Sequence, residues 1–244
     1  MSRRLVVKER LIVSLDLNDL GKIKELVKGL NGLVEIYKVG SIPFIYFGKE
    51  IIEFLKQNQK KVMLDLKFHD IPNTVARACE GAVELGIDFL TLHASGGFSM
   101  LEEAVKTTLL SAQTKKLNRP KLLGVTVLTS IDEAYFKDLF GEIKRSVTEQ
   151  VIFLAQLARS AGLDGVVASP REVEIIRKEC GKDLLIVTPG IRPKPSQDDQ
   201  ARTMTPGQAI RAGADYIVVG RPIIKAEDPV TAAKEIIEEM GNGD

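Results

Sequence analysis

The sequence predicts a (β/α)8 TIM barrel that occupies residues 1–244 as a single domain. Eight short apolar segments, rich in β-branched residues, alternate with eight amphipathic segments along the chain. The apolar segments are nearly continuous, which is typical of parallel strands covered by helices on both faces. The length of 244 residues also suits such a barrel. An open doubly wound sheet is the alternative, and only the count of eight strands separates the two.

The elements follow one another in a regular order. The expected strands are LIVSLDL (11–17), VEIYKVG (34–40), KVMLDLKF (61–68), FLTLHA (89–94), KLLGVTVL (121–128), GVVAS (165–169), LLIVTPG (184–190) and YIVVGR (216–221). The expected helices are 19–30, 48–58, 74–86, 99–113, 149–162, 171–180, 205–212 and 229–240.

Two connections are longer than a simple barrel loop needs. Residues 129–146 have room for a short extra helix, and residues 189–207 are polar and rich in proline. Both follow strands, so both are expected at the carboxyl end of the barrel, where barrel enzymes hold their active sites. Long loops in compact domains often cover or bind ligands, and 189–207 is the candidate lid.

Composition restricts the partners and the compartment. A net charge of +1 gives no reason to expect a nucleic acid or an anionic membrane as a partner. No apolar run is long enough to span a membrane, and the opening MSRRLVVKER lacks the core of a signal peptide. Cys79 and Cys180 lack CxxC spacing and are expected to be buried free thiols. These features predict a reduced, cytoplasmic protein, and two cysteines with two histidines are too few for a standard zinc site without carboxylates.

A cluster of charges lies in and after the third apolar segment. Asp65 and Lys67 are two residues apart on one strand, so their side chains share the face that points into the barrel. A lysine in such a mouth keeps its charge only where anions lie beside it. Asp65, and Asp70 if the turn folds back, supply those anions, and Lys38 ends the neighbouring strand. The residues predict an array of two ammonium and two carboxylate groups.

Other interpretations of these charges remain open. The array could be a buried ion-pair network that only holds the barrel mouth together. Asp70 could cap the helix whose first turn contains Pro72, although Asn73 and Thr74 could cap it as well.

The last two strands offer an anion site. Loops after strands seven and eight of such barrels often bind phosphate. Gly220 allows the backbone to approach an anion, Arg221 can fork onto phosphate oxygens, and Arg192 can add a second cation. A loop arginine paired with a nearby acid is the alternative. His93 ends the fourth strand and could be either a hydrogen-bonded wall residue or a base. The glycines that follow it do not form a dinucleotide-binding motif.

The segment DLKFHDIPNTV resembles the signature of the orotidine 5′-phosphate decarboxylase family, D-x-K-x-x-D-I-x-x-T. The resemblance extends over the chain through SLDL, YKVG, VTVLTS, TPGIRP and VVGRPI, in that order. It implies decarboxylation of orotidine 5′-phosphate to uridine 5′-phosphate, the last step of UMP biosynthesis, without a cofactor.

The resemblance also implies a role for each matching position. Lys67 would protonate C6 of the pyrimidine, Asp65 and Asp70 would lie beside the substrate carboxylate, and Lys38 would complete the array. The remaining substrate-binding positions would be Asp16 at the ribose together with Lys38, Thr129 at the pyrimidine edge, Gln200 between base and phosphate, Arg192, Gly220 and Arg221 at the phosphate, and Ile71 within the motif. Asp70 and Thr74 would act across the interface of a homodimer.

Two alternative functions are compatible with the same fold. Magnesium-dependent lyases of sugar phosphates, of the keto-gulonate-phosphate and hexulose-phosphate type, share a similar D-x-K-x-x-D strand. The IPNT, VTVLTS and PGIRP segments argue against them. A barrel that binds a nucleotide monophosphate without turnover is the second rival.

Overall fold

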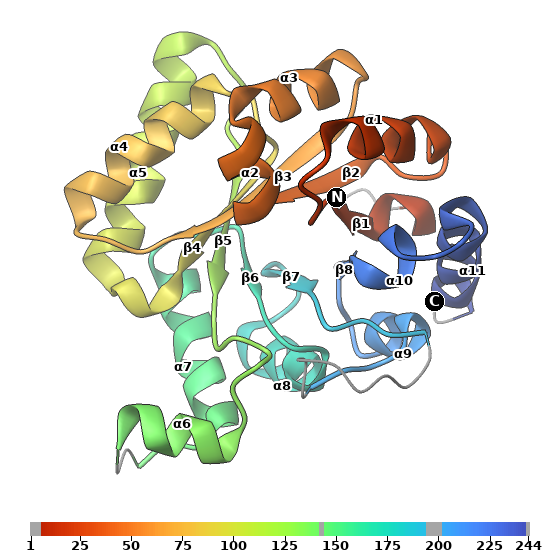
Figure 1. The fold of residues 1–244 in the computed structure, drawn as a ribbon. Helices are drawn as coiled ribbons and strands as arrows, with labels where there is room; N and C mark the ends of the chain where they lie inside the picture. Colours follow the sequence, from red (N-terminus) through yellow and green to blue (C-terminus); the bar gives the residue numbers. More distant parts are fainter. Residues whose placement is uncertain (1–5, 142–143, 194–201, 243–244) are drawn as a thin grey trace.

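Eight parallel strands close into a barrel in chain order, and β1 pairs with β8 to complete it. The computed structural model describes residues 6–141, 144–193 and 202–242. The strands are β1 (Leu11–Ser14), β2 (Ile36–Gly40), β3 (Lys61–Phe68), β4 (Phe89–His93), β5 (Lys121–Val125), β6 (Gly165–Val167), β7 (Leu185–Thr188) and β8 (Tyr216–Val219) (Figure 1). The predicted barrel and its eight strands are confirmed.

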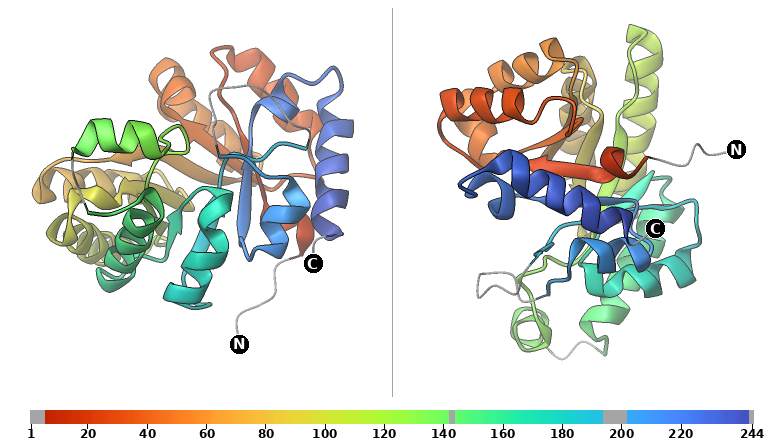
Figure 2. Two further views of the ribbon diagram at one scale, coloured as in Figure 1. Left: turned by 90° about the horizontal axis from the view of Figure 1, so that it is seen from below. Right: turned by 90° about the vertical axis from the view of Figure 1, so that its right-hand side faces the viewer.

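Helices surround the strands on the outside, as two perpendicular views make clear (Figure 2). They are α1 (Leu20–Gly29), α2 (Ser41–Phe47), α3 (Lys49–Gln57), α4 (Pro72–Glu84), α5 (Phe98–Lys115), α6 (Glu133–Phe140), α7 (Val147–Ser160), α8 (Val173–Cys180), α9 (Pro206–Arg211), α10 (Arg221–Ile224) and α11 (Pro229–Gly241). Short 3-10 turns cover Val7–Arg10, Ala94–Gly96 and Pro170–Glu172. The extra helix expected within 129–146 is α6, whereas α2 and α10 had no counterpart in the sequence prediction.

Side-chain caps fix where several helices begin. Asp19 accepts a hydrogen bond from the Lys22 N–H at the start of α1. Ser146 and Glu149 form a reciprocal capping box at the start of α7. Such caps satisfy backbone donors that the first helical turn leaves without partners, so they set the lengths of the loops between strands and helices.

Two apolar layers hold the barrel together. Inward-facing side chains from alternate positions, among them Ile12, Met63 and Phe89, fill its interior. Side chains of the opposite strand faces, such as Leu11 and Val13, pack against the helices. This alternation follows from the two-residue period of a strand. The interior layer fills the barrel, so a ligand is restricted to the open carboxyl end.

The long connection from β7 to α9 is held at its base by backbone pairing. Ile191 and Met204 form an isolated parallel bridge. The Arg192 N–H donates to the Met204 carbonyl at 2.9 Å, and the Met204 N–H donates to the Gly190 carbonyl at 3.3 Å. The candidate lid therefore leaves and rejoins the barrel at neighbouring points, and its residues 194–201 lie outside the described part of the chain.

Two smaller expectations concern the thiols and the membrane. Cys79 and Cys180 are both buried and free, as predicted. Within the described ranges, no helix combines the length and the apolar character needed to cross a bilayer.

Candidate active site

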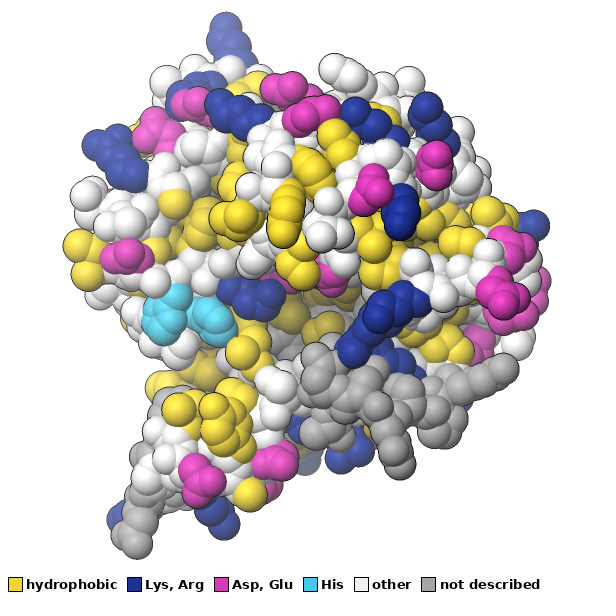
Figure 3. Space-filling model, in the orientation of Figure 1, with side chains coloured by type: hydrophobic (Ala, Val, Ile, Leu, Met, Phe, Trp, Pro, Cys, Tyr) yellow, Lys and Arg dark blue, Asp and Glu magenta, His cyan; other side chains and the backbone are white. Residues whose placement is uncertain are grey.

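The carboxyl end of the barrel opens into a cavity of about 520 Å³, within the usual range for small-molecule sites. In a space-filling view the cavity is a hollow flanked by lysine and arginine side chains (Figure 3). Eight of the residues predicted from the sequence line it: Asp16, Lys38, Asp65, Lys67, Thr129, Arg192, Gly220 and Arg221.

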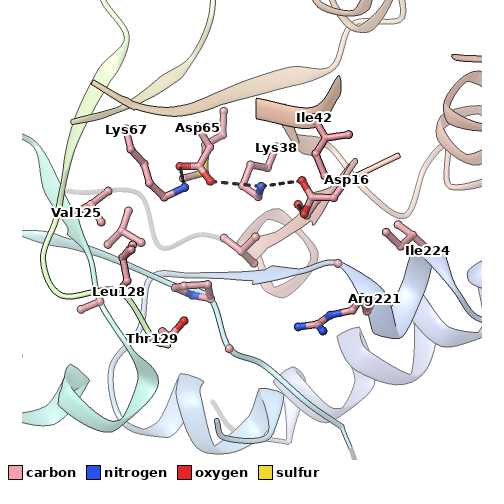
Figure 4. A pocket seen from close by; sticks show the side chains of 18 of the residues that line it. Asp16, Lys38, Ile42, Asp65, Lys67, Val125, Leu128, Thr129, Arg221 and Ile224 are labelled. Carbon is pink, nitrogen blue, oxygen red and sulfur yellow. Dashed lines mark hydrogen bonds and ion pairs between the residues drawn. The ribbon is translucent and has the colours of Figure 1, made fainter. Parts of the chain in front are cut away.

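Four of these residues form a continuous row of alternating charges along one wall (Figure 4). Asp65 Oδ1 lies 2.9 Å from Lys67 Nζ, and its Oδ2 lies 3.3 Å from Lys38 Nζ. Lys38 Nζ also lies 3.3 Å from Asp16 Oδ1. The row runs from β3 through β2 to Asp16, two residues after the end of β1. Its fourth member is Asp16, where the sequence had predicted Asp70.

Asp65 is the centre of the row and is 7% exposed. Burial by itself raises the pKa of the Asp65 carboxyl, but Lys38 and Lys67, with hydrogen bonds from Lys67 and Thr91, outweigh it and hold that pKa below its ordinary value. Asp65 is therefore an anion at neutral pH and holds both ammonium groups in place.

Thr91, on β4, supports this arrangement and was missed in the sequence. Its hydroxyl donates to Asp65 Oδ1 at 2.9 Å and accepts the Lys67 N–H at 3.0 Å. Lys67 has a φ of 50°, in the left-handed region, and the pairing of β3 with β4 shifts register between Leu64 and Phe68. A left-handed residue costs roughly 1–2 kcal/mol. Thr91 stabilises this backbone, and the one signal in the sequence was a polar residue inside the apolar FLTLH.

Gly40 leaves the space that the row needs. It pairs with Asp65 in the register of β2 and β3. A Cβ atom at Gly40 would lie 3.0 Å from Lys38 Nζ and 3.1 Å from Asp16 Oδ1. Ser14 holds the far end of the row, because its hydroxyl donates to Asp16 Oδ2 at 2.6 Å. Neither residue had been singled out by sequence reasoning.

The opposite side of the cavity carries Arg221, one of the predicted phosphate-binding groups, together with Thr129. Arg221 begins α10 directly after Gly220, and Thr129 lies beyond the end of β5, both facing the charged row (Figure 4). Arg192 is only 8% exposed and donates from Nη1 to the Ile191 carbonyl at 2.8 Å. The cavity thus has the lysine–aspartate row on one side and Arg221 on the other, and Arg192 also lines it.

Three predicted residues lie outside the cavity. Asp70, Ile71 and Thr74 are exposed, and none lines the cavity. Asp70 does not cap α4, because Ile71 is the N-cap residue and the Asp70 carboxylate accepts the Ile71 N–H at 2.6 Å. Asn73 and Thr74 do not cap it either, since α4 begins at Pro72, earlier than expected.

Gln200, the remaining predicted residue, lies outside the described residues, and His93 lies beside the cavity without lining it. The His93 ring is 5.3 Å from the His69 ring, centroid to centroid. Burial lowers the pKa of His93, and the nearby His69 and Lys67 lower it further, against the opposite effect of Asp65. In the described part of the chain, no three His, Cys, Asp or Glu side chains are grouped so as to hold a metal ion.

Fold and site together define a (β/α)8-barrel enzyme in which lysines, aspartates and arginines line one cavity. The model of the family described as "Orotidine 5'-phosphate decarboxylase / HUMPS family" matches residues 9–236. The chain is 47% identical over 238 residues to the orotidine 5′-phosphate decarboxylase of Syntrophus aciditrophicus (strain SB), covering 96% of this chain and 94% of the relative.

Two further relatives agree with this match. The orotidine 5′-phosphate decarboxylase of Moorella thermoacetica is also 47% identical, over 97% of this chain and 94% of its own. The crystal structure of the orotidine 5′-phosphate decarboxylase from Lactobacillus acidophilus superposes with a TM-score of 0.83 at 38% identity, covering 95% of this chain and 99% of the other. The chain belongs to the orotidine 5′-phosphate decarboxylase / HUMPS family.

Proposed function

We propose that this protein decarboxylates orotidine 5′-phosphate to uridine 5′-phosphate and CO2, the last step of UMP biosynthesis, without a metal or an organic cofactor. The observation that carries the proposal is the Lys38–Asp65–Lys67 row, which faces Arg221 across a cavity of about 520 Å³ that Arg192 also lines. The names of the curated relatives support the same substrate.

The charged row suits a reaction that develops negative charge on carbon. When the bond between C6 and the carboxylate breaks, the electron pair stays on C6 and neutral CO2 leaves. The ring cannot delocalise that pair, so a fixed ammonium group must stabilise it. Lys67 Nζ, held by Asp65 at 2.9 Å, then donates a proton to C6 and regains one from solvent. Lys67 is therefore proposed as the proton donor.

The rest of the cavity would bind the parts of the substrate that do not react. Asp16 and Lys38 would hold the ribose hydroxyls, and Thr129 would contact the pyrimidine edge. Arg192, Arg221 and the backbone at Gly220 would bind the phosphate. Binding energy from the distant phosphate can stabilise the transition state by fixing the ring against the charged row.

The test is the loss of orotidine 5′-phosphate absorbance, with and without excess EDTA. Wild type should show rapid loss that EDTA leaves unchanged, and Lys67→Ala should abolish it. Lys61→Ala removes an exposed lysine at the other end of the same strand and should retain activity. No loss of orotidine 5′-phosphate in folded wild type, together with turnover of a sugar phosphate that EDTA abolishes, would instead indicate a magnesium-dependent sugar-phosphate lyase. Binding without turnover in folded wild type would indicate the binding-only barrel.

We also propose a homodimer in which Asp70 and Thr74 complete the partner's site. Both residues are exposed and follow the carboxyl end of β3, the strand that carries Lys67, and Ile71 exposes 67% of its surface. Mixing inactive Asp70→Ala and Lys67→Ala chains should restore part of the activity, because one site of each heterodimer receives both wild-type residues. Verified heterodimers without recovered activity would refute a role for Asp70 across the interface.

A further inference from the structure

Arg202 is a buried arginine outside the predicted site, on the segment that returns from the β7–α9 connection. It is 7% exposed, and its Nη1 lies 2.6 Å from Oε1 of Glu172, which is 4% exposed. Glu172 belongs to the 3-10 turn after β6. The pair therefore joins two loops that follow different strands at the carboxyl end of the barrel.

The second guanidinium nitrogen reaches a third loop. Arg202 Nη2 donates to the backbone carbonyls of Leu128 at 3.0 Å and Val127 at 3.3 Å. Val127, Leu128 and Thr129 all line the cavity, whereas Arg202 does not. Its own segment is fixed two residues later, where Met204 pairs with Ile191. Arg202 thus holds the outer side of the wall that carries Thr129.

Stability is a weak explanation for this ion pair. Burying two charges costs several kcal/mol per ion unless hydrogen bonds satisfy them fully, and replacement by apolar side chains is often neutral or stabilising. Among the described residues, neither Oε2 of Glu172 nor Nε of Arg202 has a hydrogen-bond partner, although both atoms are buried. The pairing is therefore incomplete, and the placement of the loop after β5 accounts better for its presence.

The geometry points to Arg202 as a positioning residue that fixes residues 127–129 as the wall against which the substrate's pyrimidine lies. This inference rests on the proposed function, since it takes Thr129 as the contact to the pyrimidine edge. Arg202 touches no substrate itself. Its effect should reach ligands that carry a base and spare ligands that carry only the ribose and phosphate.

Arg202→Lys is the direct test, because lysine can keep the ion pair with Glu172 but lacks the fork that reaches the two carbonyls. We expect uridine 5′-phosphate to bind about tenfold more weakly, with ribose 5-phosphate unchanged. Arg202→Met combined with Glu172→Met removes both charges at once, so this second variant should fold and show the same selective loss. Melting temperatures report on folding separately from binding.

Arg177→Lys is the matched control. Arg177 also bridges an acid and backbone carbonyls, since Nη2 lies 2.7 Å from Asp215 Oδ2 and Nη1 donates to the Leu184 carbonyl, but these groups precede β7 and β8 at the other end of the barrel. The Arg177→Lys variant should have a lower melting temperature but no selective loss of uridine 5′-phosphate binding. Equal effects on both ligands, or none, in either folded Arg202 variant would overturn the inference. Absent turnover in wild type would instead refute the proposed function.

Discussion

Thr91→Val isolates the support beneath the charged row. Valine has nearly the volume of threonine but neither donates nor accepts a hydrogen bond. The change removes the donor 2.9 Å from Asp65 Oδ1 and leaves the Lys67 N–H, now 3.0 Å from the hydroxyl, without its acceptor. Thr91 is fully buried, so water cannot replace either contact.

The loss of these two hydrogen bonds sets the size of the expected destabilisation. A hydrogen bond to a charged group contributes about 1.5–3 kcal/mol, and a buried backbone N–H without an acceptor costs about 1–3 kcal/mol. We expect the free energy of unfolding to fall by about 3–4 kcal/mol at pH 7. Because Lys67 holds a left-handed φ of 50° beside this contact, kcat should fall by about tenfold or more as its ammonium loses its fixed position.

The pH dependence of the stability deficit shows whether the lost contact acts through the Asp65 carboxylate. The lowered pKa of Asp65 means that its contribution to stability is full above about 3.8 and is lost as the pH falls through the lower folded-state value. Thr91→Val raises that folded-state pKa, so its stability deficit should shrink below about pH 4. The share that comes from the Lys67 N–H should persist at every pH.

Urea unfolding at several pH values, with Thr91→Ser as the control, measures the share of the deficit that comes from Asp65 and the share that comes from the Lys67 N–H. Serine keeps the hydroxyl and loses one methyl group, so it should cost only about 1 kcal/mol, independent of pH. Equal stability of the valine and serine variants would refute the role assigned to the hydroxyl. A deficit of the valine variant that stays constant with pH would refute its action through the carboxylate.

Three further predictions concern the rest of the site. Gly40→Ala should lower kcat/KM by about tenfold, equal to about 1.4 kcal/mol, because its Cβ would crowd Lys38 Nζ and Asp16 Oδ1. Steady-state kinetics at unchanged melting temperature would check this, and unaltered kinetics would contradict it. His93 has a lowered pKa, so its contribution to stability is full above about pH 6.5 and falls with the pH below that value. In urea unfolding, His93→Gln should flatten the dependence of stability on pH below about 6.5. An unchanged slope would exclude His93 as the source of that dependence. Specific activity of wild type should fall on dilution as the proposed dimer dissociates, whereas full activity in solutions that sedimentation shows to be monomeric would contradict a role for Asp70 across the interface.

The fold was predictable because its signals are local and repeated. Each strand is an apolar segment with a fixed period, and eight of them alternate with amphipathic helices. Helix α2 was missed because Ser41–Phe47 contains Pro43 and an aromatic, β-branched composition that resembles a strand or loop. Helix α10 has only four residues, too few to produce a period.

The site was predictable where neighbouring positions on one strand set the geometry. Asp65 and Lys67 share a face, as the spacing indicated. What the sequence could not provide is contact between segments that are distant along the chain. These contacts are the Thr91 hydroxyl on Lys67, between two strands, and Arg202 on Glu172, thirty residues apart. The alternative that Asp70 caps α4 does not hold, because Ile71 is the N-cap residue and the Asp70 carboxylate accepts the Ile71 N–H.

The order of charges in the row explains how a nearly neutral wall can favour the proposed reaction. Two ammonium and two carboxylate groups alternate along it, so their combined charge does little to hold an anionic substrate. During decarboxylation, however, negative charge moves from the substrate carboxylate to C6. With the carboxylate near Asp65 and C6 near Lys67, repulsion decreases and attraction increases in the same step. Both changes lower the energy of the transition state relative to the bound substrate, which is the condition for acceleration. The alternation of charge, more than its total, is what the proposed chemistry requires.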